Sequence, residues 1–487
     1  MDLFCAPFPS TTRKSALLAT LATAGILGAT APVSFAGSVD ISGVLPVAVD
    51  QPQINAIITK PSNGTALTTS GGYSVIQAYL DTGTSSIVLA NSTWNSLGIS
   101  PATVNGQNVV FNDVAIGGTT PFYVSSSGYD ISTAPFSVNT DQTLGGTPPP
   151  LSSFGNTVGP ANLELTEQPS STSILTGATD IMGMPVMDGK VTVLDIGPAN
   201  HLANLNNLGE TQTYIYAPGT PFNPSTLNTN PGIVPTTYQV GLSYASFQQF
   251  TSVSPTDATD ATYAPNPFIG ANPVMAFNGQ TQANAPPGVT IAFNNSSATG
   301  SFLLDTGAAS SFISQSMAAK LGVEYEAGTY GTSSPVLVYA ATGKVVPDQF
   351  TIPLGGAGGS SITAAGFYLS SLSLQTKQGT TITFQNAPVE VVDITVTDPT
   401  TKTSLTLDGD LGMNFFEPSA TVNLGNVNAA AFNWMTIDQP DSQLGLIMAG
   451  DNPVPEPAAL PLSLLGLSLL LVRRSRLRRQ DRRMLSR

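Results

Sequence analysis

The sequence contains a single cysteine and a single histidine, and this scarcity excludes several kinds of chemistry. Cys5 lies at the very start, so the rest of the chain has neither a thiol nucleophile nor a disulfide. His201 lies in a polar stretch and no Gly-x-Ser-x-Gly motif accompanies it, which disfavours a Ser-His-Asp triad. A zinc site of ordinary ligation needs more His and Cys than this, and Asp257 and Asp260 lack the glycine and distal glutamate of a calcium loop. The sequence therefore predicts neither metal nor cofactor.

Positive charge is also scarce between the two ends of the chain. Arg13 and Lys14 lie near the start, and eight arginines follow Val472. The body between residues 37 and 453 has only six lysines against 27 acidic residues, a net charge of −21. Such a surface repels phosphate backbones, so nucleic acid is not an expected partner.

The first 36 residues have the order of a secretory signal. Arg13 and Lys14 precede an apolar run from Ala16 to Ala31, and Ser34-Phe35-Ala36 supplies small residues at the cleavage positions. Charge, apolar run and small residues in this order are typical of a signal peptide rather than a core helix. We therefore predict a signal peptide at residues 1–36 and an exported protein.

The C-terminal segment 454–487 has three parts. Val454-Pro455-Glu456-Pro457 is followed by an apolar stretch, Ala458–Val472, and then by the arginines. Fifteen apolar residues are short for a span of roughly 17–25 residues, and the arginines would remain cytoplasmic, leaving residues 37–453 outside. The tail resembles the PEP-CTERM sorting signals of Gram-negative bacteria. That resemblance implies processing by an exosortase, a link to extracellular polysaccharide, and a cell-surface or extracellular location; a plain single-span anchor is the alternative.

Long helical periodicity is missing, and 38 prolines and 46 glycines interrupt the chain throughout, so we predict an all-β fold. Short apolar runs at residues 54–59 and 74–80 read as strands. Residues 289–293 and 300–304 flank a polar stretch and predict a hairpin.

The triplet Asp-Thr-Gly occurs twice, 224 positions apart, each time after an apolar run. The copies are Asp81-Thr82-Gly83-Thr84 and Asp305-Thr306-Gly307-Ala308. A single copy would be read as a turn after a strand. Two copies in matching contexts instead predict two carboxylates that are brought together by related halves.

The surroundings of the two copies also repeat, which indicates a duplicated unit. Seventeen residues after each Asp comes Leu97-Gly98-Ile99 or Leu321-Gly322-Val323, each preceded by a short potential helix. Each half closes with an apolar element containing Gly-Met: Asp180-Ile181-Met182-Gly183 in the first and Asp410-Leu411-Gly412 in the second.

This order of parts resembles the aspartic proteases, both the bilobal pepsin-like enzymes and the retropepsins. The resemblance implies a bilobal pepsin-like fold with two related β-barrel-like lobes and an interlobe sheet. We place the lobes at residues 40–200 and 285–450, with an interlobe segment at 201–284. It also implies that Thr82 and Thr306 hydrogen bond across the lobe junction. Thr84 can hydrogen bond a carboxylate and Ala308 cannot; retropepsins also carry Ala there.

Two adjacent carboxylates suit acid–base hydrolysis. They cannot both ionise cheaply, so they hold one proton between them; the charged member can activate water while the other protonates a carbonyl oxygen. We therefore predict an aspartic endopeptidase that acts on polypeptides, with Asp81 and Asp305 as the catalytic pair and Thr82, Gly83, Thr84, Thr306 and Gly307 in support. The alternatives are an inactive protease-like surface or matrix-binding protein, and a glycoside hydrolase with carboxylates about 5–9.5 Å apart.

The substrate-covering flap cannot be assigned from sequence. Phe122-Tyr123 and Tyr129 are candidates, each of which could equally be a packing residue. Residues 330–334 resemble a pepsin flap sequence but fall in the second half, where that role is not expected.

Overall fold

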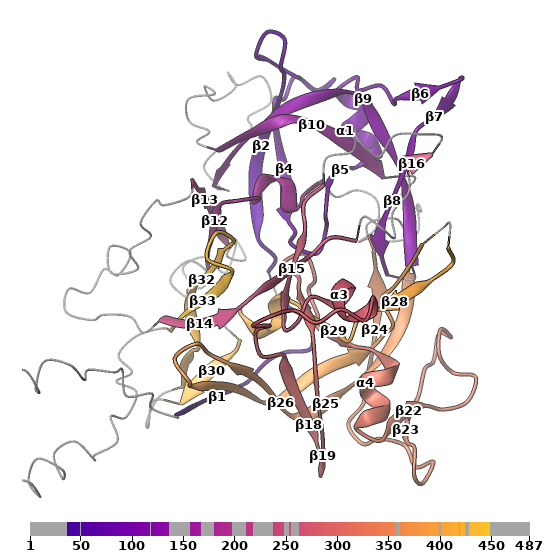
Figure 1. Cartoon of the computed structure of the whole chain (residues 1–487), viewed down its shortest axis with the longest axis vertical. Helices are drawn as coiled ribbons and strands as arrows, with labels where there is room; N and C mark the ends of the chain where they lie inside the picture. Colours follow the sequence, from indigo (N-terminus) through magenta and orange to yellow (C-terminus); the bar gives the residue numbers. More distant parts are fainter. Residues whose placement is uncertain are drawn as a thin grey trace, which may run out of the picture.

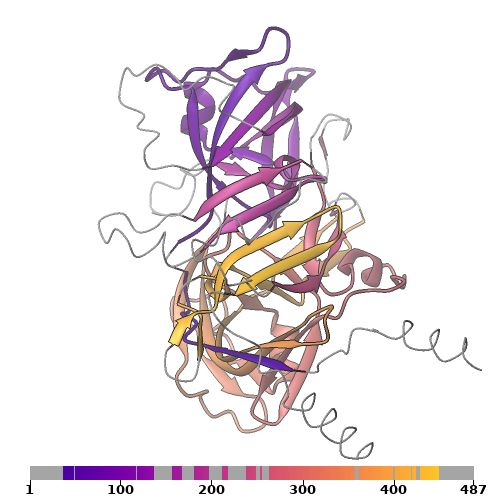
Figure 2. The ribbon, with the colours of Figure 1, turned by 90° about the vertical axis from the view of Figure 1, so that its left-hand side faces the viewer.

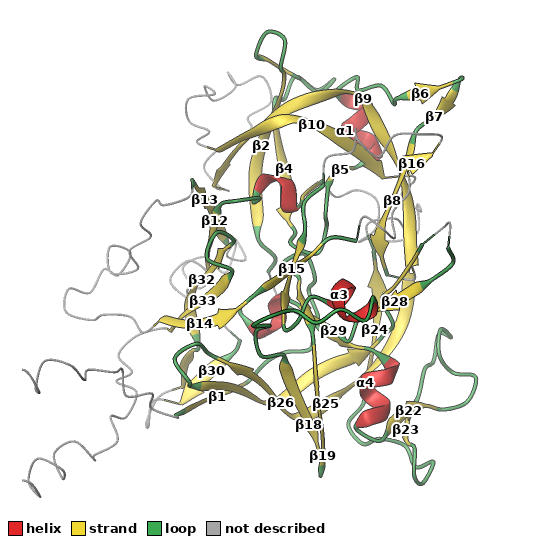
Figure 3. Ribbon diagram, viewed as in Figure 1, coloured by secondary structure: helices red, strands yellow, loops and turns green. Residues whose placement is uncertain are grey.

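The computed structural model describes residues 37–48, 50–116, 118–135, 156–166, 180–196, 211–217, 237–247, 253–254, 263–356, 361–398, 401–417, 419–423 and 428–448. Strands dominate, and the α-helices in this part are the short α1 (Asn91–Ser96), α3 (Pro273–Phe277) and α4 (Gln315–Lys320) (Figure 3). Two lobes lie one above the other in Figure 1. The predicted all-β class and bilobal architecture are confirmed.

The first lobe is built mainly from residues 53–186. Its strands are β2 (Gln53–Lys60), β3 (Thr65–Ala66), β4 (Val75–Leu80), β5 (Ile87–Leu89), β6 (Thr103–Val104), β7 (Gln107–Asn108), β8 (Val110–Ala115), β9 (Gly118–Pro135), β10 (Asn156–Thr166) and β11 (Ile181–Met182), and β11 leads into the 3₁₀ turn η2 (Met184–Val186). The predicted strands at 54–59 and 74–80 are β2 and β4, which pair antiparallel.

The second lobe repeats this plan. Its strands are β18 (Val289–Phe293), β19 (Ser296–Gly300), β20 (Phe302–Leu304), β21 (Phe312–Ile313), β22 (Val323–Tyr325), β23 (Leu337–Tyr339), β24 (Phe350–Gly355), β25 (Ser361–Gln375), β26 (Thr381–Val391), β27 (Thr395–Thr397), β28 (Ser404–Thr406), β29 (Gly409–Leu411), β30 (Thr421–Asn423) and β31 (Asn428–Ala430), with the 3₁₀ turn η5 (Met413–Phe415) after β29.

The strand order shows the duplication directly. The first lobe runs β4-β11-β5-β10-β9-β8, and the second runs β20-β29-β21-β26-β25-β24. In each, the closing strand is parallel to the strand before Asp-Thr-Gly and antiparallel to the strand after it. The repeated Leu-Gly pairs end α1 and α4, where Gly98 and Gly322 have φ of 67° and 77°, the left-handed conformation that suits glycine after a helix.

A further set of strands joins the lobes. It consists of β12 (Val191–Asp195), β13 (Gln212–Tyr216), β14 (Thr237–Gly241), β32 (Phe432–Asp438) and β33 (Gln443–Met448), in the order β14-β33-β32-β12-β13. Figure 2 shows the yellow C-terminal strands between the purple first lobe and the orange second lobe. Strands from opposite ends of the sequence therefore form the predicted interlobe sheet.

Other strands near the lobe boundaries also cross between regions. β1 (Ser38–Ser42) lies in the second-lobe sheet, parallel to β26. β15 (Ser243–Ala245) and β17 (Asn266–Ile269) extend the same sheet beside β20, and β16 (Val253–Ser254) pairs with β8. The predicted lobe ranges 40–200 and 285–450 therefore do not coincide with the two sheets, because some strands pair across these ranges. We keep the ranges as a proposed division of the sequence.

The predicted hairpin at 289–304 has a different register. β18 pairs with β19 across the two-residue turn Asn294-Asn295, and Asn294 has a φ of 53°. Asn tolerates this left-handed conformation, which favours a tight hairpin turn. Residues 302–304 form β20 instead, which runs into the middle of the molecule between β17 and β29.

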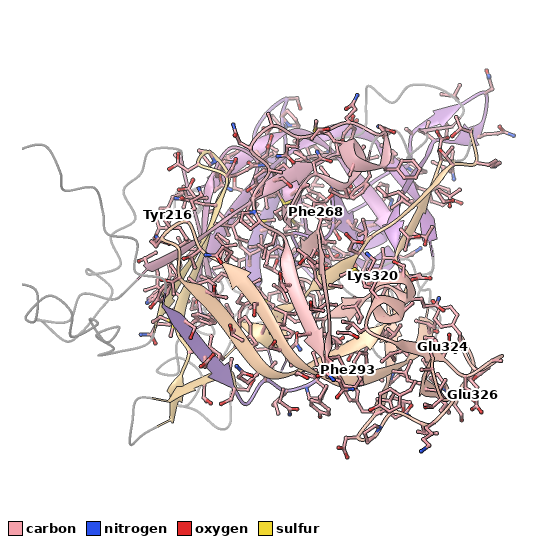
Figure 4. All side chains as sticks on the ribbon, turned by 60° about the horizontal axis from the view of Figure 1, so that its bottom comes forward. Tyr216, Phe268, Phe293, Lys320, Glu324 and Glu326 are labelled. Carbon is pink, nitrogen blue, oxygen red and sulfur yellow. The ribbon has the colours of Figure 1, made fainter. Side chains whose placement is uncertain are left out.

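The largest apolar core is continuous through both lobes, and a second cluster lies in the second lobe. This second cluster includes Phe268, Leu303, Phe312, Leu354 and Val392. Phe268 lies near the centre in Figure 4, whereas Lys320, Glu324 and Glu326 lie at one side of the second lobe. Ala308, in the loop that carries Asp305, packs against this second cluster.

Candidate active site

Both Asp-Thr-Gly triplets lie in loops that begin where a central strand ends. Asp81 follows β4, and Asp305 follows β20. Each is held by the closing strand of its own lobe: the Asp81 N–H donates to the Met182 carbonyl at 3.1 Å, and the Asp305 N–H to the Leu411 carbonyl at 3.0 Å. The two loops are therefore built in the same way.

The glycines of the closing elements permit this close packing. A Cβ at Gly183 would overlap the carbonyl oxygens of Thr84 and Ser86, and one at Gly412 would overlap the backbone of Ala308 and Ser310. Any side chain here would push the closing strand away from the catalytic loop. The repeated Gly of the closing elements is explained by this contact.

The two threonines interlock the loops at the lobe junction. Thr82 Oγ1 accepts from the Thr306 N–H at 3.0 Å and donates to the Leu304 carbonyl at 2.5 Å. Thr306 Oγ1 accepts from the Thr82 N–H at 3.1 Å and donates to the Leu80 carbonyl at 2.7 Å. Both threonines are fully buried. This reciprocal set of four hydrogen bonds fixes the position of one loop relative to the other.

Additional contacts hold the loops from the outside. The Gln51 side-chain amide donates to the Gly307 carbonyl, and the Asn266 amide donates to the Thr82 carbonyl at 2.8 Å. The Ala48 N–H donates to the Ala309 carbonyl at 2.6 Å. Residues far apart in sequence thus order the backbone on both sides of the junction.

The two carboxyl groups face each other across the junction. A Cβ at Gly83 would overlap the Asp305 carboxyl, and a Cβ at Gly307 would overlap that of Asp81. The two carboxyls hydrogen bond each other. Asp81 is 9% exposed and Asp305 is partly exposed, so solvent reaches the pair.

Backbone and side-chain donors fix each carboxylate. Asp81 Oδ1 accepts from the N–H groups of Gly83 and Thr84 at 2.7 and 3.1 Å, and Asp81 Oδ2 accepts from the Thr84 hydroxyl at 2.6 Å. Asp305 Oδ1 accepts from the N–H groups of Gly307 and Ala308 at 2.8 and 3.1 Å. Ala308 has no hydroxyl, so Asp81 receives three of these donors and Asp305 two.

The environment of Asp305 favours its protonated form. Burial raises the pKa of Asp305 well above its usual value, and the nearby carboxyls of Asp81 and Asp410 raise this pKa further; the Gly307 N–H opposes the shift. A carboxyl that favours its protonated form beside a partner with more hydrogen-bond donors is the arrangement of a shared-proton pair.

The hairpin formed by β8 and β9 extends from the first lobe to the second. Its tip residue, Ile116, packs against the second-lobe apolar cluster that also contacts Ala308. β9 also lies beside β27 of the second lobe. This hairpin therefore bridges the two lobes near the Asp305 loop, and it is a candidate for the substrate-covering flap.

The sequence-based flap candidates are placed differently. Phe122 and Tyr129 lie on β9 and are buried in the first lobe, and Tyr123 is partly buried there. Tyr330 lies between β22 and β23, packed on Tyr325 with ring centroids 4.9 Å apart. The first three are packing residues, whereas Tyr330 is 37% exposed. The contact of Ile116 with the other lobe was not predicted, because nothing local in the sequence marks it.

Several other candidates lie outside the described residues: Cys5, His201, Asp257, Asp260, the signal segment 1–36 and the tail 454–487. Within the described ranges, no three His, Cys, Asp or Glu side chains are arranged to hold a metal ion. No helix in the described part of the chain has the length and apolar character of a membrane span.

Comparison with known proteins agrees with this site in the second lobe. A family model described as "Aspartyl protease" matches residues 289–346, which include Asp305-Thr306-Gly307. A search of curated proteins gave no match. Among solved structures, an aspartic proteinase from Irpex lacteus is similar, with 14% identity, 82% of this chain and 97% of that chain covered, and a TM-score of 0.27. A similarity at this TM-score carries no information about the site. The hydrogen bonds between the two Asp-Thr-Gly loops instead indicate that the first lobe contributes to the site.

Proposed function

We propose that the chain is an exported aspartic endopeptidase that hydrolyses peptide bonds with water activated between Asp81 and Asp305. The observation that carries this proposal is the interlocked pair of Asp-Thr-Gly loops, which holds two carboxyls in mutual hydrogen-bond contact. The family match at residues 289–346 supports the same class of chemistry.

The hydrogen bonds favour one division of roles within the pair. Asp81 accepts three hydrogen bonds from its own loop, which stabilise its negative charge, and acts as the base that takes a proton from water. Asp305 holds the proton and donates it to the carbonyl oxygen of the peptide. The water oxygen then bonds to the carbonyl carbon, and the tetrahedral intermediate forms without a free charge on its oxygens. When the C–N bond breaks, the proton taken up by Asp81 passes to the leaving nitrogen, and one hydroxyl of the intermediate returns its proton to Asp305, which leaves a carboxylic acid product and restores the singly protonated pair.

Two other functions fit the geometry less well. A glycoside hydrolase needs its carboxyls about 5–9.5 Å apart, whereas these two hydrogen bond each other. Trp94, which could have lined a sugar-binding cleft, is buried in the first-lobe core. A protease-like binding protein without activity would retain the fold, and activity measurements separate it from an enzyme.

The decisive experiment measures hydrolysis of an unfolded protein by residues 37–453 at several pH values. We expect activity on the acidic side of neutrality, because the pair works only while singly protonated. Asp81→Asn and Asp305→Asn should each abolish turnover while leaving the unfolding transition in place. Near-normal turnover in either variant would contradict the shared mechanism, and loss of activity with a chelator, restored by zinc or calcium, would contradict it as well.

The two ends of the chain support a proposal about location. We propose that residues 1–36 direct export and that the tail 454–487 is a PEP-CTERM-type signal, removed by an exosortase at the membrane. The mature protein would then act on polypeptides at the cell surface or outside the cell, where the PEP-CTERM resemblance implies a link to extracellular polysaccharide. The acidic composition of the body supports a location away from nucleic acid.

A further inference from the structure

A third carboxyl lies directly behind the pair. Asp410 is in the middle of β29, between β20 and β21, where its register partners are Leu303 and Phe312. Paired residues on adjacent strands project from the same face of a sheet, so the Asp410 side chain shares its face with two members of the second-lobe apolar cluster. It is 1% exposed.

The contacts of Asp410 point toward the pair. The side chain of Leu303 lies on the same face as that of Asp305, two residues along the strand, so Asp410 is diagonal to Asp305 across the β20–β29 register. The Asp410 carboxyl accepts a hydrogen bond from the Asp305 carboxyl, which favours the charged form of Asp410. The other oxygen of Asp410, Oδ1, is buried without a hydrogen-bond partner. A buried, half-satisfied carboxyl that touches a reacting group is costly unless it is protonated.

The first lobe provides the matched reference position. Ile181 has the same place in β11 as Asp410 has in β29: its register partners are Tyr79, two residues before Asp81, and Val88. The two lobes therefore differ at two positions around their carboxyls. The first lobe has a hydroxyl at Thr84 and an apolar residue behind; the second lobe has Ala308 and an acid behind.

These differences are complementary. Thr84 donates a hydrogen bond to Asp81 at 2.6 Å, and nothing at Ala308 can do the same for Asp305. We propose that Asp410 is a positioning residue that accepts a hydrogen bond from Asp305 from behind and so helps the Asp81–Asp305 pair to keep its shared proton. This inference rests on the proposed function for its effect on turnover, but the contact itself is independent of it.

Sharing the proton has a predictable effect on pH dependence. The titratable groups that face Asp410 are Asp305 and Asp81 from the two loops, and Glu390 of β26, which lies in the same cross-strand row beyond Phe312. Burial raises the pKa of Asp410 well above its usual value, and the Asp81 charge adds to this. When Asp410 loses its proton as pH rises, its charge strengthens the hold of the pair on its remaining proton. The singly protonated pair therefore persists to higher pH than two carboxyls alone would allow.

Three variants of the full-length chain separate the hydrogen bond from the charge. Asp410→Asn keeps an acceptor oxygen but cannot become charged, so the basic limb of the kcat/KM profile should move to lower pH. Asp410→Ile copies the first lobe and removes the acceptor, so kcat should fall roughly ten- to a hundred-fold at the optimum, as expected for a lost hydrogen bond to a charged group. Adding Ala308→Thr to Asp410→Ile gives Asp305 a donor, which favours its charged form, and should not restore kcat.

Glu390→Gln is the matched control, because Glu390 is also fully buried in the same row but is separated from Asp410 by Phe312. We expect it to leave the basic limb closer to that of the unchanged chain than Asp410→Asn does. A basic limb that moves equally in both variants, or in neither, would overturn the proposal. So would an Asp410→Ile defect that Ala308→Thr relieves.

A measurement without turnover keeps this inference distinct from the proposed function. Carboxyl carbons of ¹³C-labelled aspartate can be followed by NMR across pH, with Asp305→Asn identifying the Asp305 signal. We expect that signal to titrate at lower pH in Asp410→Asn than in the unchanged chain. An Asp305 titration that Asp410→Asn does not move would refute the shared proton. A chain that hydrolyses no peptide yet shows this shift would refute only the proposed function.

Discussion

Replacing Thr82 with valine tests the junction that holds the two lobes together. Valine has nearly the same shape as threonine but lacks the hydroxyl, so the change leaves the Thr306 N–H and the Leu304 carbonyl without partners. Thr306 and Leu304 are both fully buried, so water cannot replace the lost bonds without opening the junction. Each unsatisfied buried group costs about 1–3 kcal/mol. With two such groups, the free energy of unfolding should therefore fall by about 2–6 kcal/mol.

Thr82→Ser is the matched control, because it keeps both hydrogen bonds and removes one methyl group, at a cost of about 1 kcal/mol. Equilibrium urea unfolding of the three proteins measures the difference. Thr306→Val should lose a similar amount, since it leaves the Thr82 N–H and the Leu80 carbonyl unpaired. If Thr82→Val unfolds at the same urea concentration as Thr82→Ser, the four hydrogen bonds contribute little and the junction must be held by other contacts.

Three further changes have defined outcomes. Burial raises the pKa of Asp180 to about 6. Between pH about 4 and 6 the folded chain therefore keeps a proton that the unfolded chain has lost. Because the folded state binds more protons in this range, the free energy of unfolding falls as pH rises. Asp180→Asn should remove up to about 1.4 kcal/mol per pH unit of this slope in urea titrations, and an unchanged slope would contradict it. Ile116→Asn should raise KM about fivefold with little change in kcat, because it removes an apolar contact that contributes about 1 kcal/mol. Ile116→Val keeps an apolar side chain and should leave KM unchanged. Equal kinetics in the two variants would exclude the hairpin as a flap. Intact mass of protein recovered from native cells should show a C-terminus near residues 455–457, and retention of the arginine cluster would favour a simple anchor.

The features that could be predicted best from the sequence are those that occur in both halves of the duplicated unit. Asp-Thr-Gly, the helix ending in Leu-Gly and the closing Gly-Met element each recur because each is a local backbone solution with few alternatives: a turn beneath a carboxyl, a left-handed residue after a helix, and a contact with no room for a Cβ. Recurrence at matched spacing made these residues readable without any knowledge of the fold.

The features that the sequence did not reveal depend on contacts between distant segments. Ile116 is an ordinary apolar residue at a hairpin tip until β8 and β9 are laid against the second lobe. The register of the hairpin after β18 depends on the left-handed Asn294, which sequence alone did not distinguish from a longer loop. β1 shows the same limit, because its partner β26 lies more than three hundred residues away.

Asp410 shows where comparison of the two halves goes further than motif matching. Its sequence context marks it as part of a closing element, and an acid in such an element is easily read as a tolerated variant. The register of β29 places Asp410 opposite Leu303 and beside Asp305. The equivalent residue of the first lobe is Ile181, so the first lobe has no acid at this position. A duplicated fold with one shared proton does not need two identical halves. One half must stabilise a charge, which three donors on Asp81 do; the other must hold a proton, for which a buried carboxyl behind Asp305 is better suited than a second hydroxyl.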